Sequence, residues 1–217
     1  MPIFVSAMLF DLDGVLADST ASVYRAWTMW GERVGLTPEE LLHHVHGRRA
    51  IDTVRALRPQ LDAEAELEYL VGLETKNNED VSSMPGAIDL VKSLPPDAWA
   101  VVTSGMRAVA MARLVAAGVP LPKTMISGES VSRGKPDPEG YLMGAAALGV
   151  SPEQCVVVED APAGAAAARA AGMRLLGLTS THDASALEPA DLIVPDLSHV
   201  RVSVSHGGGV RLEIAAR

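Results

Sequence analysis

The feature that most constrains this sequence is the alternation of short apolar runs with helical patterns. The apolar runs are short enough to be single buried strands, and they lie at 3–10, 98–102, 123–127, 155–158, 174–178 and 191–196. Helical patterns that end at a glycine lie between the later runs, at 106–117, 138–148 and 162–171. Strands that alternate with helices form a parallel sheet covered on both faces. The sequence therefore predicts an α/β fold with a doubly wound, Rossmann-like parallel sheet.

One interval is too long for a simple crossover between two parallel strands. Residues 18–82, which follow the first strand, carry almost only helical patterns. Trp27 and Trp30 lie at helical spacing in the first of these patterns, and further helices are expected near 38–45, 50–57 and 63–77. We therefore expect a helical cap at 18–82, inserted into a core made of 1–17 and 83–217. The tryptophans are expected to pack between cap helices.

Shorter signals predict where helices start and how the chain ends. The motifs "TPEE" (37–40) and "SPEQ" (151–154) are typical of capping boxes with proline at the first helical position. Asp18 and Ser19 are expected to form the hinge and the N-cap of the first cap helix. The tail alternates in hydropathy around a glycine triplet at 207–209, which predicts a hairpin.

Charge and composition narrow the range of partners. The formal net charge is -9, which argues against a nucleic-acid backbone or an anionic membrane as partner. The single cysteine, Cys155, cannot form an internal disulfide and is expected to be buried in a strand. The apolar N-terminal stretch lacks a basic leader region, and no stretch approaches membrane-spanning length. We therefore expect a cytoplasmic protein that is a monomer or a weak dimer.

Polar side chains with chemical capability follow four of the predicted strands. Two acids follow the first strand, two hydroxyl residues the second, a lysine the third and two acids the fourth; these residues are Asp11, Asp13, Thr103, Ser104, Lys135, Glu159 and Asp160. The carboxyl ends of parallel strands share one edge of an open α/β sheet, and ligands bind there. We therefore expect these residues to meet in one crevice.

The chemistry of this set indicates phosphoryl transfer. Four converging carboxylates repel one another, and a hard divalent cation with oxygen ligands such as Mg²⁺ removes that repulsion. Lys135 suits a phosphate beside a carboxylate, while the Thr103 hydroxyl and the Ser104 amide lie near a helix N-terminus and can donate to phosphate. One acid can then attack phosphorus, and the second, set back by a turn at Gly14, can carry the proton. The substrate predicted is a small-molecule phosphate ester.

The same residues carry a resemblance to a known family. The stretches "DLDGVLADS", "VVTSG", "GKPDPEGY" and "VVVEDAPAG" resemble, in order and spacing, the four motifs of the haloacid dehalogenase-like superfamily. The resemblance covers residues 6–180. It implies that Asp11 is the nucleophile and Asp13 the general acid and base.

The resemblance also implies roles for the remaining motif residues. Thr103 and Lys135 are expected to bind the phosphoryl group, and Asp160 is expected to hold Mg²⁺ with Asp11 and the backbone carbonyl of the second acid. Glu159 is expected to support Lys135 and the shell of the metal. Mg²⁺ is thus the implied cofactor.

The cap narrows the activity that the resemblance implies. A cap inserted after the first strand, with "HGRRA" at 46–50, is similar to that of small sugar- and polyol-phosphate phosphatases. In a basic cluster at 43–49, His46 and Arg49 are expected to face the crevice and bind substrate, and a solvated basic patch is the alternative. We therefore expect an Mg²⁺-dependent phosphatase that acts on small sugar or polyol monophosphates through a phosphoaspartate.

Other functions fit the sequence less well. The alternative is a phosphosugar mutase of the β-phosphoglucomutase kind, which has a cap histidine where this chain has Val23. True dehalogenases lack an acid at the position of Asp13. A signalling receiver domain has its phosphoacceptor later in the sheet and no comparable cap. A binding protein with a disabled site is disfavoured because no motif residue is missing.

Overall fold

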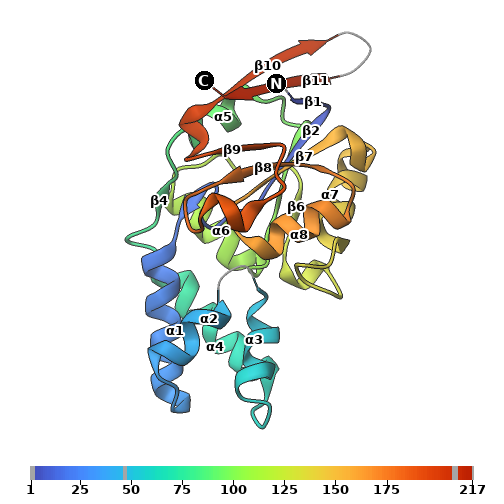
Figure 1. Ribbon diagram of the computed structural model, residues 1–217. Coiled ribbons are helices and arrows are strands. Elements are labelled where there is room, and N and C mark those ends of the chain that lie inside the picture. The colour runs from blue at the N-terminus through green and yellow to red at the C-terminus, as the bar shows by residue number, and fades with distance from the viewer. Residues whose placement is uncertain (1–2, 46–47, 207–209, 217) are drawn as a thin grey trace.

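A computed structural model describes residues 3–45, 48–206 and 210–216 of the chain (Figure 1). Its centre is a six-stranded, entirely parallel sheet, with strands in the order β6 (Met125–Ile126), β5 (Trp99–Val102), β2 (Ala7–Phe10), β7 (Cys155–Glu159), β8 (Arg174–Leu178) and β9 (Leu192–Val194). The predicted α/β fold is confirmed. Cys155 is buried in β7, as predicted.

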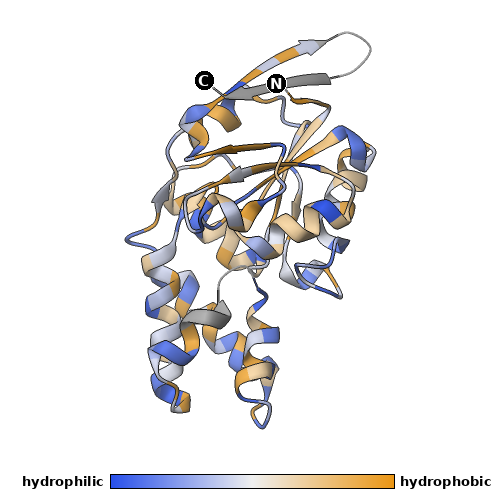
Figure 2. Ribbon diagram, viewed as in Figure 1, coloured by the Kyte–Doolittle hydropathy of each residue, from blue (hydrophilic) through white to orange (hydrophobic). Residues whose placement is uncertain are grey.

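Successive residues of a strand point to opposite faces of the sheet, and the strand residues here are apolar on both faces. Helices cover both faces and bury these side chains. On one face, Met8 and Phe10 of β2 belong to the apolar cluster that contains buried residues of α5 (Ala87–Ser93) and α6 (Arg107–Ala116). On the other face, Leu9 belongs to the cluster of α7 (Glu139–Leu148) and α8 (Pro162–Ala170). Figure 2 shows the hydrophobic colouring concentrated along these central strands. Helix α5 was not predicted.

The insertion after the first strand forms a separate helical cap. Its helices are α1 (Thr20–Val34), α2 (Pro38–Val45), α3 (Ala50–Leu57) and α4 (Ala63–Lys76), and they lie together on one side of the core (Figure 1). They share an apolar cluster in which Trp27 and Trp30 pack edge to face at a ring-centroid distance of 5.4 Å, as predicted. The described helices include none long and apolar enough to cross a membrane.

The chain leaves the core and returns to it at one place. Strands β3 (Ala17–Asp18) and β4 (Ser82–Ser83) pair antiparallel, with Ala17 opposite Ser83. This pair coincides with the predicted limits of the cap, and the division into core and cap at these residues stays a prediction.

The prediction of one strand over residues 3–10 is wrong. The run forms β1 (Ile3–Val5) and β2, which belong to different sheets. The chain changes partner at Ser6, whose backbone N–H donates to the Gln154 carbonyl at 2.7 Å. Strand β1 pairs antiparallel with β11 (Val210–Ala216), which forms the predicted tail hairpin with β10 (Val200–His206). This small sheet lies at the end of the core away from the cap (Figure 1).

Of the three predicted helix caps, one forms the side-chain hydrogen bonds of a capping box. Thr37 and Glu40 form the predicted reciprocal capping box at the start of α2, with N···O distances of 2.7 and 3.4 Å. The second motif forms only a short 3₁₀ helix, η2 (Pro152–Gln154), because the chain enters β7 directly afterwards. Ser19 is the N-cap residue of α1, as predicted, but its side chain makes no capping hydrogen bond, and its hydroxyl donates to Asp13.

Candidate active site

The loop after β2 places two carboxylates at the carboxyl edge of the sheet. Asp11 follows the last residue of the strand, and its N–H donates to the Val158 carbonyl at 3.0 Å. Gly14 then turns the chain with a φ of 79°, a conformation that other residues adopt only with strain. A Cβ on Gly14 would lie 2.2 Å from a carboxylate oxygen of Asp160. Glycine is therefore required for the loop to approach Asp160.

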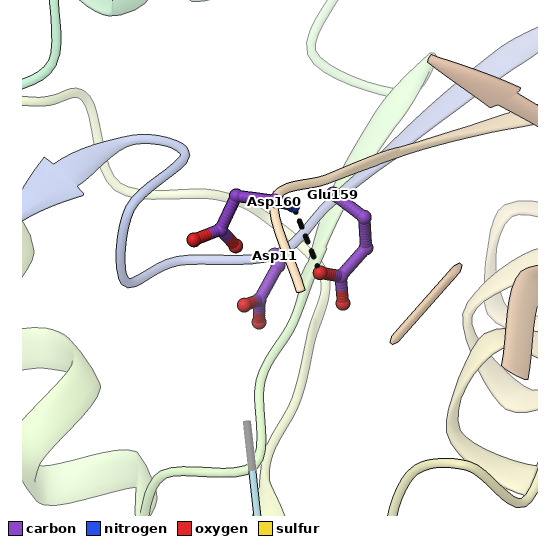
Figure 3. Close-up of side chains that lie close together, drawn as sticks. All are labelled: Asp11, Glu159 and Asp160. Atoms are coloured by element: carbon purple, nitrogen blue, oxygen red, sulfur yellow. Dashed lines mark hydrogen bonds between the residues drawn. The ribbon is translucent and has the colours of Figure 1, made fainter. Parts of the chain in front are cut away.

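The first of two buried charge clusters surrounds Asp11. We call Asp11, Lys135, Glu159 and Asp160 the lysine cluster. Lys135 Nζ lies 2.8 Å from Asp11 Oδ1 and 2.6 Å from Glu159 Oε1, and all these side chains are almost completely buried. One oxygen from each of the three carboxylates lies within 4.8 Å of the others, and Figure 3 shows the three side chains gathered at the strand ends. Three acids thus lie beside one lysine, which pairs with two of them.

Within this cluster, Glu159 is fully engaged with protein partners. Its Oε1 accepts from Lys135 and, at 2.7 Å, from the Tyr141 hydroxyl. Its Oε2 accepts from the backbone N–H groups of Asp160 and Ala161, the first of which is drawn in Figure 3. These contacts favour the expected supporting role over direct contact with a metal, and its predicted place among the metal ligands stays a prediction.

Asp11 and Asp160 are left with more negative charge than the protein offsets. Burial raises the pKa of Asp11 to about 7, against the opposing effect of Lys135. Burial also raises the pKa of Asp160 well above its ordinary value. Burial alone would lower the pKa of Lys135, but Asp11 and Glu159 raise it. Because Asp160 Oδ1 is buried without any hydrogen-bond partner, the residues fit a divalent cation with oxygen ligands.

The second buried charge cluster surrounds Asp13. We call Asp13, Ser19, Glu74 and Arg113 the arginine cluster. Arg113 Nη1 lies 2.8 Å from Asp13 Oδ2, and Arg113 Nη2 lies 2.9 Å from Glu74 Oε1. The Ser19 hydroxyl donates to Asp13 Oδ1 at 2.5 Å. Arg113 comes from core helix α6 and Glu74 from cap helix α4, so this cluster joins core and cap.

The sequence did not indicate this second cluster. Arg113 lies in the last turn of α6, and an arginine in a helical pattern is ordinarily solvent-exposed. Glu74 lies on the last predicted cap helix, and nothing in the sequence decides whether it contributes to the site. Its position in the last turn of α4, beside Arg113 of the core, becomes evident only once the cap is placed on the core.

The remaining predicted core residues lie at the same crevice. Thr103 and Ser104 follow β5 directly, and Thr103 Oγ1 accepts from the Gly105 N–H at 3.0 Å just before α6. They line a crevice together with Asp11, Asp13 and Asp160. Lys135 lies beneath Asp11 and lines an adjoining hollow with both hydroxyl residues. The structure therefore brings the predicted core residues together, while their individual roles stay predictions.

Of the two predicted cap residues, His46 lies outside the described residues. Arg49 contacts the core: its Nη1 donates to the Val131 carbonyl at 2.8 Å, and its Nε lies 2.7 Å from Asp52. It does not line the crevice that holds Asp11 and Asp13, whereas Arg48 does. A role of Arg49 in substrate binding stays a prediction. Val23 lies on the cap side of the crevice and leaves an apolar wall there.

The fold and the site together define a class of protein. The sequence signature of the haloacid dehalogenase-like hydrolases matches residues 5–172, and the chain belongs to that family. A solved hydrolase from Pseudomonas syringae is similar in structure, with a TM-score of 0.78 and 26% identity over 88% of this chain and 94% of the other.

Two curated relatives are similar over nearly their whole length. Hexitol phosphatase A of Escherichia coli (strain K12) is 42% identical over 94% of this chain and 97% of its own. 2-Deoxyglucose-6-phosphate phosphatase 1 of Saccharomyces cerevisiae is 35% identical over 95% of this chain and 94% of its own. The family resemblance predicted from the four motifs is confirmed.

Proposed function

We propose that this protein is an Mg²⁺-dependent phosphatase that hydrolyses small sugar or polyol monophosphates through a phosphoaspartate on Asp11. The observation that carries the proposal is the placement of two acids, one residue apart, in different buried charge clusters on one crevice. The names of the similar phosphatases, which act on a hexitol phosphate and a sugar phosphate, support the substrate class.

The first half-reaction transfers the phosphoryl group to the protein. An Asp11 carboxylate oxygen attacks phosphorus, and the bond between phosphorus and the ester oxygen breaks. Asp13 gives its proton to that oxygen, so the product leaves as a neutral alcohol. Lys135, 2.8 Å from Asp11, and Thr103, directly after β5, hold the phosphoryl oxygens in this account.

The second half-reaction returns the protein to its starting state. Asp13 takes a proton from water, the water oxygen attacks phosphorus, and the bond to Asp11 breaks to release inorganic phosphate. Asp11, Asp160 and the backbone carbonyl of Asp13 would hold Mg²⁺, which supplies positive charge beside the phosphoryl oxygens and between the carboxylates.

The cap favours water over a second sugar hydroxyl as the acceptor. A mutase of the β-phosphoglucomutase kind carries a cap histidine where this chain has Val23, and Val23 lines the cap side of this crevice beside Trp27. A hollow of about 250 Å³ opens next to the site between α3 and the loop before Lys135, which is room for the non-reacting part of a small substrate.

The test is a panel of sugar and polyol monophosphates incubated with purified protein and Mg²⁺, with inorganic phosphate and the organic product both measured. We expect equal amounts of phosphate and free alcohol. β-Glucose 1-phosphate distinguishes the alternative, because conversion to glucose 6-phosphate faster than phosphate release would establish a mutase. Absence of phosphate release from every ester would contradict the proposal.

Variants of the cap test how substrate is bound. Arg49→Ala and His46→Ala are expected to lower kcat/KM for the sugar or polyol ester and to affect a small aryl phosphate much less, because the cap contacts the non-reacting part of the substrate. Arg48→Ala is the matched comparison, since Arg48 lines the crevice. Equal losses on both esters would remove the specificity role from the varied residue.

A further inference from the structure

We propose that Arg113 is a positioning residue that aims the Asp13 carboxylate for proton transfer and ties its position to the cap through Glu74. The inference rests on the proposed function, in which Asp13 carries the proton. It concerns a residue of helix α6 that belongs to none of the four sequence motifs.

The geometry fixes the Asp13 carboxylate from two sides. Arg113 Nη1 lies 2.8 Å from Oδ2, and the Ser19 hydroxyl donates to Oδ1 at 2.5 Å. Contacts to both oxygens remove the rotational freedom that a carboxylate on a loop otherwise has. Ser19 precedes cap helix α1, so both fixing groups hold Asp13 against elements that flank the crevice.

The burial of Arg113 calls for a reason beyond helix packing. Its side chain is 3% exposed, and the other buried residues of α6 are Val109, Ala110 and Leu114. A buried guanidinium is costly unless paired, and an apolar residue would fill the same helix position at less cost. Burial alone would lower the pKa of Arg113, but Asp13 and Glu74 raise it. The residue is therefore held in place by two carboxylates, one of them on the cap.

The planar guanidinium of Arg113 connects Asp13 of the core to Glu74 of the cap in a fixed geometry. One terminal nitrogen contacts the core acid and the other contacts Glu74 Oε1 at 2.9 Å. Because the two nitrogens are rigidly joined, displacement of helix α4 from α6 frees the arginine from its cap partner and loosens its hold on Asp13. The proton carrier is thus best aimed when the cap is seated on the core.

The test separates proton transfer from every other part of the reaction. A polyol phosphate has a poor leaving group that needs a proton as the ester bond breaks, whereas 4-nitrophenyl phosphate releases a stable anion that does not. Rates of ester cleavage are measured in single turnovers with excess protein and Mg²⁺. Arg113→Met should slow cleavage of the polyol ester by about 100-fold and of the nitrophenyl ester by less than about 3-fold.

Three further variants keep the result interpretable. Arg113→Lys retains the buried charge and decides the question if Arg113→Met does not fold. It should slow cleavage of the polyol ester by about 10-fold and of the nitrophenyl ester much less, because an ammonium group lacks the two fixed nitrogens of a guanidinium. Glu74→Gln should show the split with a smaller loss. Arg107→Met is the matched control on α6, since Arg107 contacts the Met125 carbonyl and should change neither rate.

The outcomes distinguish this inference from the proposed function. Failure of the wild-type protein to cleave either ester would overturn the proposed function itself. Normal wild-type activity, with equal losses on both esters in Arg113→Met and Arg113→Lys, would show that Arg113 is structural only and would overturn the inference. Unchanged cleavage of the polyol ester in both Arg113 variants would overturn it as well.

Discussion

The lysine cluster and the arginine cluster are both built from carboxyl groups around one cation, but they differ in net charge and in the parts of the fold that contribute to them. In the lysine cluster, three buried carboxyl groups lie together, Lys135 pairs with two of them, and one oxygen of Asp160 has no hydrogen-bond partner. In the arginine cluster, two carboxyl groups share Arg113, and both oxygens of Asp13 have partners. The first lies wholly in the core, whereas the second reaches helix α4 of the cap.

This difference shows how two acids one residue apart acquire different tasks. Asp11 lies where negative charge is in excess, a place that attracts a cation and, with it, a phosphate. Asp13 lies where both of its oxygens have partners and its direction is fixed, which suits a group that gives and takes a proton. The local sequence places the two acids one residue apart, and the helices and strands around them give each acid a different electrostatic environment.

Substitution of Asp11, the proposed nucleophile, should have the largest effect on activity. Asp11→Asn should lower turnover of any phosphate ester by about 10⁴-fold or more, because an amide does not attack phosphorus. The exposed Asp97, varied in the same way, should leave turnover unchanged. Steady-state phosphate release with Mg²⁺ is the measurement, and near-normal turnover in Asp11→Asn would contradict the assignment.

The second prediction concerns the cation of the lysine cluster. Lys135→Met should lower kcat by about 100-fold or more, since it removes a donor to the phosphoryl group. It should also lower the free energy of unfolding by about 3 kcal/mol, because it leaves buried carboxylates without their partner.

The matched control is Lys123→Met, whose lysine pairs with Asp97 at 2.8 Å but is 61% exposed. That exposed pair should contribute less than about 1 kcal/mol. Urea unfolding of both variants, with and without Mg²⁺, gives the comparison. Similar destabilisation by the two substitutions would mean that the lysine cluster is no more than a surface ion pair.

The smallest effect concerns pH. In the metal-free protein the pKa of Asp11 is raised to about 7 from 3.8, so its protonated form adds stability at low pH that is lost as the pH rises through about 7. Mg²⁺ must displace that proton, and its affinity should fall about 10-fold per pH unit below about 7. The thermal shift caused by Mg²⁺ should therefore be larger at pH 8 than at pH 5.5, and equal shifts would contradict this.

Much of the lysine cluster was predictable from the sequence. Its residues follow buried strands directly or by a short loop, and parallel strands carry such residues to one edge whatever the details of packing. Asp11, Lys135 and Asp160 could be placed together for this reason. The same rule placed Thr103 beside them.

The arginine cluster was not predictable in that way. It depends on how helix α4 of the cap packs against α6, and no periodicity along the chain encodes that contact. Ser19 was predicted as the N-cap of α1 from a local pattern, which gives no sign that its hydroxyl donates to Asp13. The wrong prediction of a single first strand also concerns contacts between distant segments. The run at 3–10 has one apolar pattern, but its first part pairs with β11 and its second part belongs to the main sheet.

The central claim is that Asp11 takes the phosphoryl group and Asp13 moves protons. The direct test is mass spectrometry of acid-quenched Asp13→Asn protein after mixing with 4-nitrophenyl phosphate and Mg²⁺. Without its proton carrier the second half-reaction should stall, so the peptide that contains residue 11 should gain one phosphoryl group, and the double variant with Asp11→Asn should gain none. A phosphoryl group on any other residue, or continued turnover of Asp13→Asn with residue 11 unmodified, would contradict the account.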